Sequence, residues 1–354
     1  MTKTIRVAVI GAGMMGKNHL KTYKNLQGVE LVGVYDVFPE AAKAAAETYN
    51  IKAFSSMEEV VANVDAVSVV TTSVTHADVG EFFMNHGIHC MMEKPLATTE
   101  EGCMRLINAA KNNNVVLMVG HIERFNPAVE QMSKLLSDTT KIRSMTAQRM
   151  SAASGRITDV DVSMDLMIHD VEVVQSLMKS PVINVQAASV KTKESPLGKD
   201  YISALLEFEN GATANLTASR ITQSRVRTLT VTTDTNYIDM DFINQSINVH
   251  TQGRMPYVNQ EEIPDWMNYG LKGSVEQLFI PTNQPLQAEL AYFVKCVNGE
   301  ATPRVGGEQA LAALRVIWEI QEKMLRRGGG TRSVCQLLIL ADDKCSESGI
   351  PEHR

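Results

Sequence analysis

The stretch Ile5-Arg6-Val7-Ala8-Val9-Ile10-Gly11-Ala12-Gly13-Met14-Met15-Gly16 near the N-terminus decides the fold. The apolar run over Ile5–Ile10 predicts a buried strand, and the glycines after it satisfy the pattern G-x-G-x-x-G. Gly11 permits a tight turn, Gly13 lets the backbone approach a pyrophosphate, and Gly16 allows close packing of helix on strand. The helix that follows offers unpaired N–H groups that attract an anion, and Met14 and Met15, between the second and third glycines, are expected to contact the cofactor there. The stretch predicts a dinucleotide-binding βαβ unit.

Short β-rich runs alternate with helical patterns through the rest of the first third. Strands are predicted at Glu30–Tyr35, Ala66–Val70, Ile88–Met92 and Val115–Val119, with a weaker one at Ile51–Ser55. Helices are predicted at Lys17–Asn25, Glu40–Tyr49, Ala77–Asn85 and Glu100–Asn112. Continuous apolar strands between helices are typical of a parallel sheet covered on both faces. We therefore expect an α/β, doubly wound Rossmann domain over residues 1–121.

Beyond this domain the pattern changes to successive strands with few helices between them. Strands are predicted at Val182–Lys193, Ile202–Glu209, Ala212–Ile221, Arg225–Thr233, Tyr237–Asp241 and Ser246–His250, and helices at Pro127–Ser137, Val160–Met178, Leu286–Val297 and Gly307–Leu325. Asn210-Gly211 is a strong hairpin signal. We expect residues 122–327 to form an α+β domain with a mostly antiparallel sheet, and residues 251–282 to be irregular. Gly328–Gly330 should end the last helix, which leaves residues 328–354 as a flexible tail.

Composition excludes several classes of protein. The net charge of −6 and the pI near 5.8 argue against a general nucleic-acid or membrane-surface role. No apolar run approaches the ~20 residues that span a bilayer, and no signal peptide precedes the first strand. The five cysteines show no CxxC spacing, so neither a disulfide framework nor a metal site is expected. The cytoplasm is the simplest setting.

Asp36, at the end of the second predicted strand, indicates which cofactor is bound. A carboxylate there accepts hydrogen bonds from the adenosine ribose and repels a 2′-phosphate, and the following Val37-Phe38 carries no compensating arginine. NAD is therefore expected rather than NADP. Thr71, Thr72 and Ser73 follow the next central strand and can bind the nicotinamide side, together with His76. A loop that only caps the helix of His76 is the alternative interpretation.

Glu93-Lys94-Pro95 follows the strand predicted at Ile88–Met92. A proline pushes the residue before it into extended geometry, so Lys94 is held at the carboxyl edge of the sheet, where α/β enzymes place their ligands. Glu93 and Lys94 can both reach a bound cofactor from this edge. A solvated surface lysine is the alternative without further context.

The helix predicted at Val160–Met178 supplies that context. Asp165 and His169 lie four residues apart and therefore share a face. His169 also falls within the apolar stripe of the helix, so a buried structural histidine is the alternative. Hydride transfer from an alcohol to NAD⁺ needs a base for the hydroxyl proton and a cation for the developing alkoxide. His169, with an unperturbed pKa of ~6.5, suits the first role, Lys94 suits the second, and Asp165 can position both. All three are expected to contact substrate.

Another candidate segment, Gly120-His121-Ile122-Glu123-Arg124-Phe125-Asn126-Pro127, lies just past the last strand of the nucleotide domain. Arg124 could bind a carboxylate or phosphate bidentately, and Asn126 could contact sugar hydroxyls. A linker whose charges face water is the alternative, and we prefer it for Glu123.

Taken in order, G-x-G-x-x-G, Glu93-Lys94-Pro95 and Asp165-x-x-x-His169 resemble the Gfo/Idh/MocA family (glucose–fructose oxidoreductase/inositol dehydrogenase) over roughly residues 4–327. The resemblance implies NAD(P)-dependent oxidation or reduction of a sugar or cyclitol, with Lys94, Asp165 and His169 as catalytic residues. It also implies a C-terminal substrate-binding domain with a large open sheet, and a homodimer or homotetramer built through that sheet. The Lys94–Pro95 peptide is expected to be cis.

The segment from Gly120 to Pro127 is similar to the branch that acts on nucleotide-activated amino sugars, the UDP-N-acetylglucosamine 3-dehydrogenases. This implies oxidation of a 3-hydroxyl to a ketone, and Arg124, with Arg149 or Arg156, would favour a diphosphate-bearing substrate. One departure is Thr72-Ser73, where many members carry Thr-Pro. The alternatives are an inositol or free-sugar dehydrogenase of the same family, or a non-catalytic NAD-responsive regulator, although this chain keeps all three catalytic residues.

Overall fold

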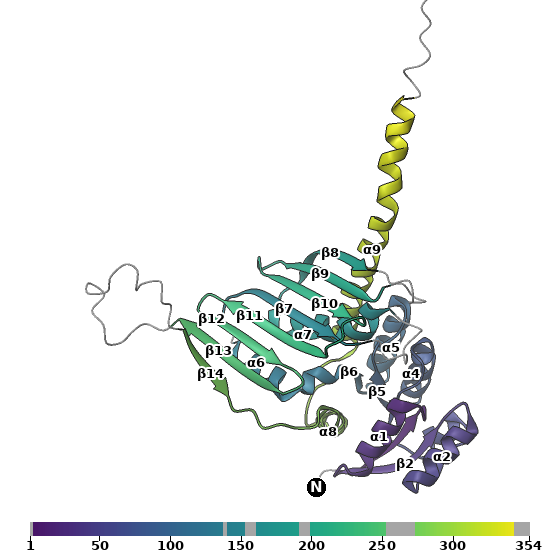
Figure 1. Ribbon diagram of the computed structural model, residues 1–354. Helices are drawn as coiled ribbons and strands as arrows, with labels where there is room; N and C mark the ends of the chain where they lie inside the picture. The colour runs from purple at the N-terminus through teal and green to yellow at the C-terminus, as the bar shows by residue number, and fades with distance from the viewer. Residues whose placement is uncertain (1–2, 137–139, 153–160, 191–198, 253–272, 343–354) are drawn as a thin grey trace, which may run out of the picture.

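The computed structural model describes residues 3–136, 140–152, 161–190, 199–252 and 273–342. Two sheets lie side by side, with the nucleotide-binding half in purple and blue and the second half in teal and green (Figure 1). The first sheet has six parallel strands in the order β3-β2-β1-β4-β5-β6. Its strands are β1 (Ile5–Ile10), β2 (Val29–Tyr35), β3 (Lys52–Ala53), β4 (Ala66–Val69), β5 (His89–Glu93) and β6 (Leu117–Gly120). The predicted doubly wound fold is confirmed.

Helices cover this sheet because its central strands are apolar on both faces. All residues of β4 and β6 are buried, as are five of the six residues of β1. The helical segments of this half are α1 (Met14–Lys24), α2 (Pro39–Tyr49), α3 (Met57–Val61), the short η1 (Ser73–Thr75), α4 (His76–Asn85) and α5 (Glu100–Asn112). The parallel order brings the ends of β1, β2, β4, β5 and β6 to one edge, where the predicted cofactor residues lie.

The second sheet has eight strands in the order β14-β13-β12-β11-β7-β10-β9-β8, and β7 with β10 is its parallel pair. Its strands are β7 (Ile142–Met150), β8 (Val182–Val190), β9 (Tyr201–Phe208), β10 (Thr213–Ser219), β11 (Val226–Thr233), β12 (Asn236–Asp241), β13 (Ser246–Gln252) and β14 (Gly273–Leu278). The expected hairpin joins β9 to β10, with Gly211 at φ +82°. The mostly antiparallel sheet is confirmed.

Two strands of this sheet were not expected. β7 lies at the centre, and β14 lies inside the range predicted to be irregular, of which residues 253–272 fall outside the described part. Along β7, buried Met145, Ala147 and Arg149 alternate with polar or partly exposed residues. Because an arginine occupies one buried position and an alanine another, the apolar alternation is too weak to reveal a strand.

Helices connect the second sheet to the first. They are η2 (Ile122–Phe125), α6 (Pro127–Leu135), the π-helical turn η3 (Ser163–Met167), α7 (Ile168–Met178), α8 (Pro285–Val297) and α9 (Gly307–Asp342). α8 packs on α1, while α9 contacts α5 and β6 of the first half as well as α7 and β8 of the second. The site therefore forms between two halves that pack directly against each other and are not joined by a linker alone.

The last helix differs from the expectation at its C-terminal end. α9 passes through Gly328–Gly330 without a break and continues to Asp342, projecting from the body of the protein (Figure 1). The expectation that these glycines end the helix is wrong, because a glycine costs only about 1 kcal/mol inside a helix and leaves the backbone hydrogen bonds intact. Residues 343–354 of the expected tail lie outside the described residues. Among the described residues, no helix has the length and apolar character needed to cross a bilayer.

Candidate active site

The glycine-rich turn between β1 and α1 leaves room for a pyrophosphate. Gly11 has φ +107°, and a Cβ there would lie 2.7 Å from the Val70 carbonyl oxygen. A Cβ on Gly16 would lie 1.9 Å from the Gly11 carbonyl oxygen. A Cβ on Gly13 would instead meet nothing within 4 Å, and no side chain caps α1 at this residue. Met14 and Met15 therefore begin the helix beside open space, and their unpaired N–H groups can bind the diphosphate of a dinucleotide.

Asp36 lies beside this turn, as expected for a ribose-binding carboxylate. Its Oδ2 accepts a hydrogen bond of 2.6 Å from the Ala12 N–H, and its Oδ1 accepts one of 2.9 Å from the Phe38 N–H. Both bonds fix the carboxylate at the end of β2. The next residues, Val37 and Phe38, are 72% and 73% exposed and supply no cation for a 2′-phosphate. This geometry fits NAD.

The loop after β4 is linked to the lysine motif by a histidine. The His76 ring nitrogens lie 2.8 Å from the Pro95 carbonyl oxygen and 3.2 Å from the Thr71 carbonyl oxygen. Burial lowers the pKa of His76, so its ring is neutral and donates one of these bonds. His76 therefore connects the backbone of Thr71 to that of Pro95. Thr72 and Ser73 lie at the start of η1, at the edge of the sheet where the cofactor is expected to bind.

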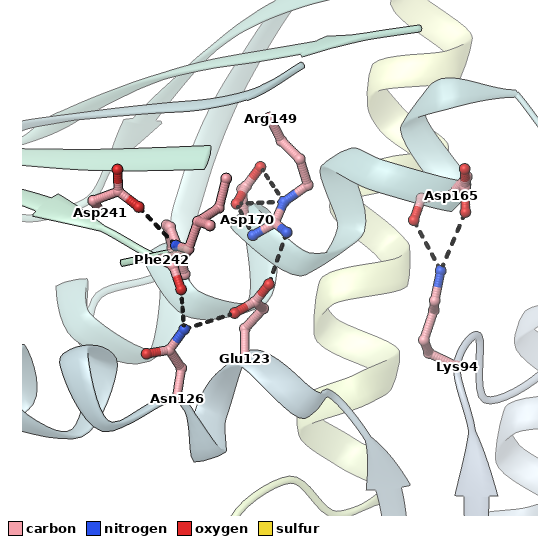
Figure 2. A network of polar contacts seen from close by, with 9 residues as sticks. Lys94, Glu123, Asn126, Arg149, Asp165, Asp170, Asp241 and Phe242 are labelled. Atoms are coloured by element: carbon pink, nitrogen blue, oxygen red, sulfur yellow. Dashed lines mark hydrogen bonds and ion pairs between the residues drawn. The ribbon is translucent and has the colours of Figure 1, made fainter. Parts of the chain in front are cut away.

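Lys94 extends from the end of β5 into the second half of the protein. Its Nζ donates a hydrogen bond of 2.8 Å to the Asp165 carbonyl oxygen and lies 3.5 Å from Asp165 Oδ1 (Figure 2). The Lys94–Pro95 peptide is cis. Asp165 lies in the π-helical turn η3, a feature that is frequent at functional sites. The structure thus brings together two of the three predicted catalytic residues, although they are 71 positions apart.

Glu93 is held in place next to Lys94. One carboxylate oxygen lies 3.1 Å from His19 Nε2, and the other accepts a hydrogen bond of 3.1 Å from the Lys94 N–H. Burial alone would raise the pKa of Glu93, but the His19 hydrogen bond and the Lys94 charge outweigh it, so the pKa is lowered. His19 of α1 thus contacts the lysine motif from the helix that begins at the glycine-rich turn.

His169 follows Asp165 on the adjoining helix α7 and is partly buried, with no hydrogen-bond partner for its Nδ1 among the described residues. Burial lowers the pKa of His169 well below its usual value, and the charge of Lys94 lowers it further. The ring is therefore neutral at physiological pH and can accept a proton. A structural core histidine would have satisfied its ring nitrogens within the protein, so this geometry favours the catalytic interpretation.

Two predicted substrate residues are instead engaged within the protein. Arg124 Nη1 donates a hydrogen bond of 2.7 Å to Glu172 Oε1, whose side chain is 4% exposed. Asn126 is 2% exposed, and its Oδ1 caps α6 by accepting a bond of 3.1 Å from the Ala128 N–H. Its Nδ2 donates a bond of 3.0 Å to the Phe242 carbonyl oxygen. The structure does not bring Arg124 or Asn126 to the site as free ligands, because each side chain is hydrogen-bonded within the protein.

Arg149, which the sequence offered as a diphosphate ligand, lies in a buried network (Figure 2). Its Nε and Nη2 donate bonds of 2.8 to 3.1 Å to the Asp170 carboxylate, and its Nη1 donates one of 2.7 Å to Glu123 Oε1. The guanidinium also lies 5.1 Å from the Phe242 ring. Arg149 and Asp170 are 2% exposed, so neither can reach substrate in this arrangement. Glu123, expected to face water, is 8% exposed. Arg156 lies outside the described residues.

Sequence reasoning missed two residues next to the catalytic group. Arg220, at the end of β10, places Nη2 3.8 Å from Asp165 Oδ2, on the carboxylate oxygen that Lys94 does not approach. His121 is 1% exposed, and burial lowers its pKa to about 3, with Lys94 adding to the effect. The signal for His121 was its position directly after β6, beside the end of β5. Arg220 follows a strand in the second half and had no motif to reveal it.

Two family models match this chain. A model described as an oxidoreductase family with an NAD-binding Rossmann fold matches residues 5–121, and the C-terminal domain model of the same Gfo/Idh/MocA family matches residues 139–238. The chain is 33% identical to UDP-N-acetylglucosamine 3-dehydrogenase of Acidithiobacillus ferrooxidans over 249 residues, which are 70% of this chain and 78% of that protein. It is 28% identical to inositol 2-dehydrogenase of Rhizobium meliloti over 230 residues, 61% of this chain and 69% of that protein.

Solved structures agree with this relationship. A crystal form of UDP-N-acetylglucosamine 3-dehydrogenase GnnA from Acidithiobacillus ferrooxidans superposes with a TM-score of 0.82 at 29% identity, covering 90% of this chain and 97% of that one. The WlbA dehydrogenase of Bordetella pertussis, solved in complex with NADH and UDP-GlcNAcA, shares the fold at 21% identity with a TM-score of 0.75, covering 92% and 96%. This chain belongs to the Gfo/Idh/MocA family of oxidoreductases, and its residues 5–121 are the NAD-binding Rossmann domain of that family.

Proposed function

We propose that this protein oxidises the 3-hydroxyl of UDP-N-acetylglucosamine to a ketone with NAD⁺ as the oxidant. The observation that carries the proposal is the approach of Lys94 Nζ to Asp165, 2.8 Å from its carbonyl oxygen and 3.5 Å from its carboxylate, with neutral His169 next along the same helical segment. The choice of sugar is supported by the 33% identity to an enzyme of that name, 78% of which is covered.

Each catalytic residue has a role that follows from its surroundings. His169 accepts the hydroxyl proton, because burial keeps its ring neutral. Lys94 donates a hydrogen bond to the oxygen on which negative charge develops, and Asp165 holds the lysine side chain in place. NAD⁺, when bound, would supply the acceptor for the hydride of the carbinol carbon. Gly11, Gly13, Gly16 and Asp36 would hold the diphosphate and ribose of the cofactor.

The test is NADH formation by the purified protein with UDP-N-acetylglucosamine deuterated at carbon 3. We expect absorbance of NADH to rise, the deuterium to appear in the reduced nicotinamide, and the product to be the 3-keto sugar by mass spectrometry. Turnover of myo-inositol without turnover of the nucleotide sugar would favour the inositol dehydrogenase alternative. NAD⁺ binding without NADH from any sugar or cyclitol would favour a regulator.

We also propose a homodimer or homotetramer built through the eight-stranded sheet. α6 and α7 cover one face of this sheet, whereas among the described residues no helix covers the other (Figure 1). That open face carries Tyr237, 44% exposed, and Val275, 58% exposed. Sedimentation equilibrium should give the mass of two or four chains, and a monomer at micromolar concentration would contradict the proposal.

We place the protein in the reducing cytoplasm. Cys90, Cys103 and Cys296 are buried free thiols, which suits a compartment where disulfides do not form. Fractionation of the source cells, with immunodetection of the protein, tests this assignment; recovery from an oxidising compartment would contradict it.

A further inference from the structure

The arginines expected from the sequence to bind a substrate diphosphate are not free to bind one in this structure. Arg124 is paired with Glu172, and Arg149 donates its side-chain hydrogen bonds to Asp170 and Glu123. A nucleotide sugar carries two negative charges on its diphosphate, and burying them requires charged or strongly polar partners. If the proposed substrate class is right, another cation must meet this group.

Arg227 is one arginine whose position fits, and it is distinct from Arg220, which already contacts Asp165. It lies on β11 directly opposite Arg149 of β7 in an antiparallel pair. Side chains directly opposite in such a pair point to the same face of the sheet. The Arg149 side chain reaches Asp170 on α7, so Arg227 also lies on the face that α7 covers, the face that carries His169.

Within the described part of the chain, the Arg227 guanidinium makes no hydrogen bond or ion pair. Burial lowers its pKa, and the nearby charges of Arg149 and Arg225 lower it further. Glu123 and Asp170 are close enough to oppose this effect, but both are already bonded to Arg149. None of the Arg227 nitrogens is among the fully buried atoms that lack a partner, so solvent reaches the guanidinium, and a ligand that displaces this solvent can accept its hydrogen bonds.

The charged groups around His169 also indicate an anion-binding site. Besides burial, the groups that lower its pKa are Lys94, Arg149, His121 and Arg227, from four different segments. Of the carboxylates in this region, Asp165 lies between Lys94 and Arg220, and Asp170 is bonded to Arg149. The space in front of the catalytic histidine therefore has a positive potential, which attracts an anionic substrate.

We propose that Arg227 is the anion-binding residue of the substrate site and donates hydrogen bonds to the diphosphate of a nucleotide sugar. The proposal rests on the proposed function for its substrate class. A sugar carboxylate offers the same oxyanion chemistry, and the experiment below separates the two sources. Arg227 acts on substrate selection and orientation, while Lys94 and His169 carry out proton transfer and charge stabilisation.

The experiment is a calorimetric titration of NAD⁺-saturated protein with UDP, so that UDP cannot occupy the cofactor site. Arg227→Met should weaken UDP binding about 10- to 100-fold, the factor that corresponds to losing a charge-assisted hydrogen bond. Arg227→Lys, which keeps the charge but not the planar fork, should weaken it less. Arg225→Met removes the same charge two residues away, where the side chain is exposed, and should bind UDP like the unchanged protein. NAD⁺ affinity and thermal unfolding of every variant are measured in parallel.

Several results would overturn the proposal. These are equal UDP affinity in Arg227→Met and the unchanged protein, equal losses in Arg225→Met and Arg227→Met, or no UDP binding by the unchanged protein. If Arg227→Met loses affinity for glucuronate but not for UDP, the anion is a carboxylate and the assignment to a diphosphate is wrong. Because the titration needs no turnover, a protein that binds UDP through Arg227 but does not oxidise UDP-N-acetylglucosamine would refute the proposed reaction and leave the anion site standing.

Discussion

Replacing Arg149 with methionine tests whether the buried charge network holds the substrate domain together. Methionine fills a similar volume but donates no hydrogen bond, so Asp170 and Glu123 lose the cation that binds them. Asp170 is 2% exposed, and burial already raises its pKa despite Arg149. Removing one partner of a buried ion pair costs about 3–5 kcal/mol, because the other charge is left without compensation.

The pH dependence of this cost follows from the carboxylate that is left behind. Without Arg149 the pKa of folded Asp170 rises further above its unfolded value of ~3.9. A raised carboxyl pKa stabilises the folded state at low pH and loses that stabilisation as the pH rises through the folded pKa. Arg149→Met should therefore cost more at pH 8 than at pH 5. Adding Asp170→Asn removes the buried charge, so the double variant should recover about 1–2 kcal/mol at pH 8.

Equilibrium urea unfolding followed by circular dichroism measures these free energies. Arg143→Met is the matched control, because Arg143 lies on the same strand and pairs with Asp234 at the surface, where the two side chains are 61% and 43% exposed. An exposed pair contributes about 0–1 kcal/mol. A cost for Arg149→Met no larger than that of Arg143→Met, or one that does not change with pH, would refute the assignment of Arg149 to a buried network.

Three further predictions concern single residues. Lys94→Met should lower kcat about 10²- to 10⁴-fold and leave NAD⁺ affinity within a few-fold by fluorescence titration; near-normal turnover would remove Lys94 from the mechanism. Asp36→Ala should raise kcat/KM with NADP⁺ relative to NAD⁺, and an unchanged ratio would show that Asp36 does not contact the ribose. Burial raises the pKa of Glu172 to about 7, so its contribution to folding is lost as pH rises between about 4.5 and 7. Glu172→Gln should therefore flatten the pH dependence of the unfolding free energy over that range, by on the order of 2 kcal/mol, and an equally steep profile would contradict the shift.

The nucleotide-binding half could be predicted because its signals are local. β1 was predicted with the bounds that the structure has, and α5 likewise, because a mostly apolar strand and a helix capped by Thr99 are each encoded in one short, continuous stretch of sequence. The positions of Lys94 and Asp36 could be predicted from the strands β5 and β2, since Lys94 lies directly after β5 and Asp36 directly after β2. In this part of the chain, the local pattern of apolar residues predicts the same strand or helix that the structure forms there.

The second half was predicted less completely because its decisive contacts are distant in sequence. Arg149 is 21 positions from Asp170 and 26 from Glu123, and nothing in the neighbourhood of any of them indicates the pairing. The charge on Arg149 also hid β7, since a strand that buries an arginine lacks the apolar alternation by which strands are detected. The same distance effect led to Arg124 being interpreted as a ligand, because Glu172 lies 48 positions away.

The segment from His121 to Asn126 is a structural joint, and this changes which residues can determine the substrate. Glu123 and Asn126 bind partners in the second sheet and its turns, while the Arg304 guanidinium lies 4.9 Å from the Phe125 ring and donates to the Arg124 carbonyl oxygen. Such contacts fix the orientation of η2, which follows β6 at the sheet edge of Lys94 and contacts α7, the helix that carries His169. A rigid joint keeps the lysine and histidine aligned, because positioning errors near 1 Å can cost 10²-fold in rate. When a relative has the same motif in this segment, the motif therefore indicates that both proteins join their two domains in the same way. The choice of substrate must be made by side chains that the joint leaves free, and Arg227 is the one at which that choice can be tested.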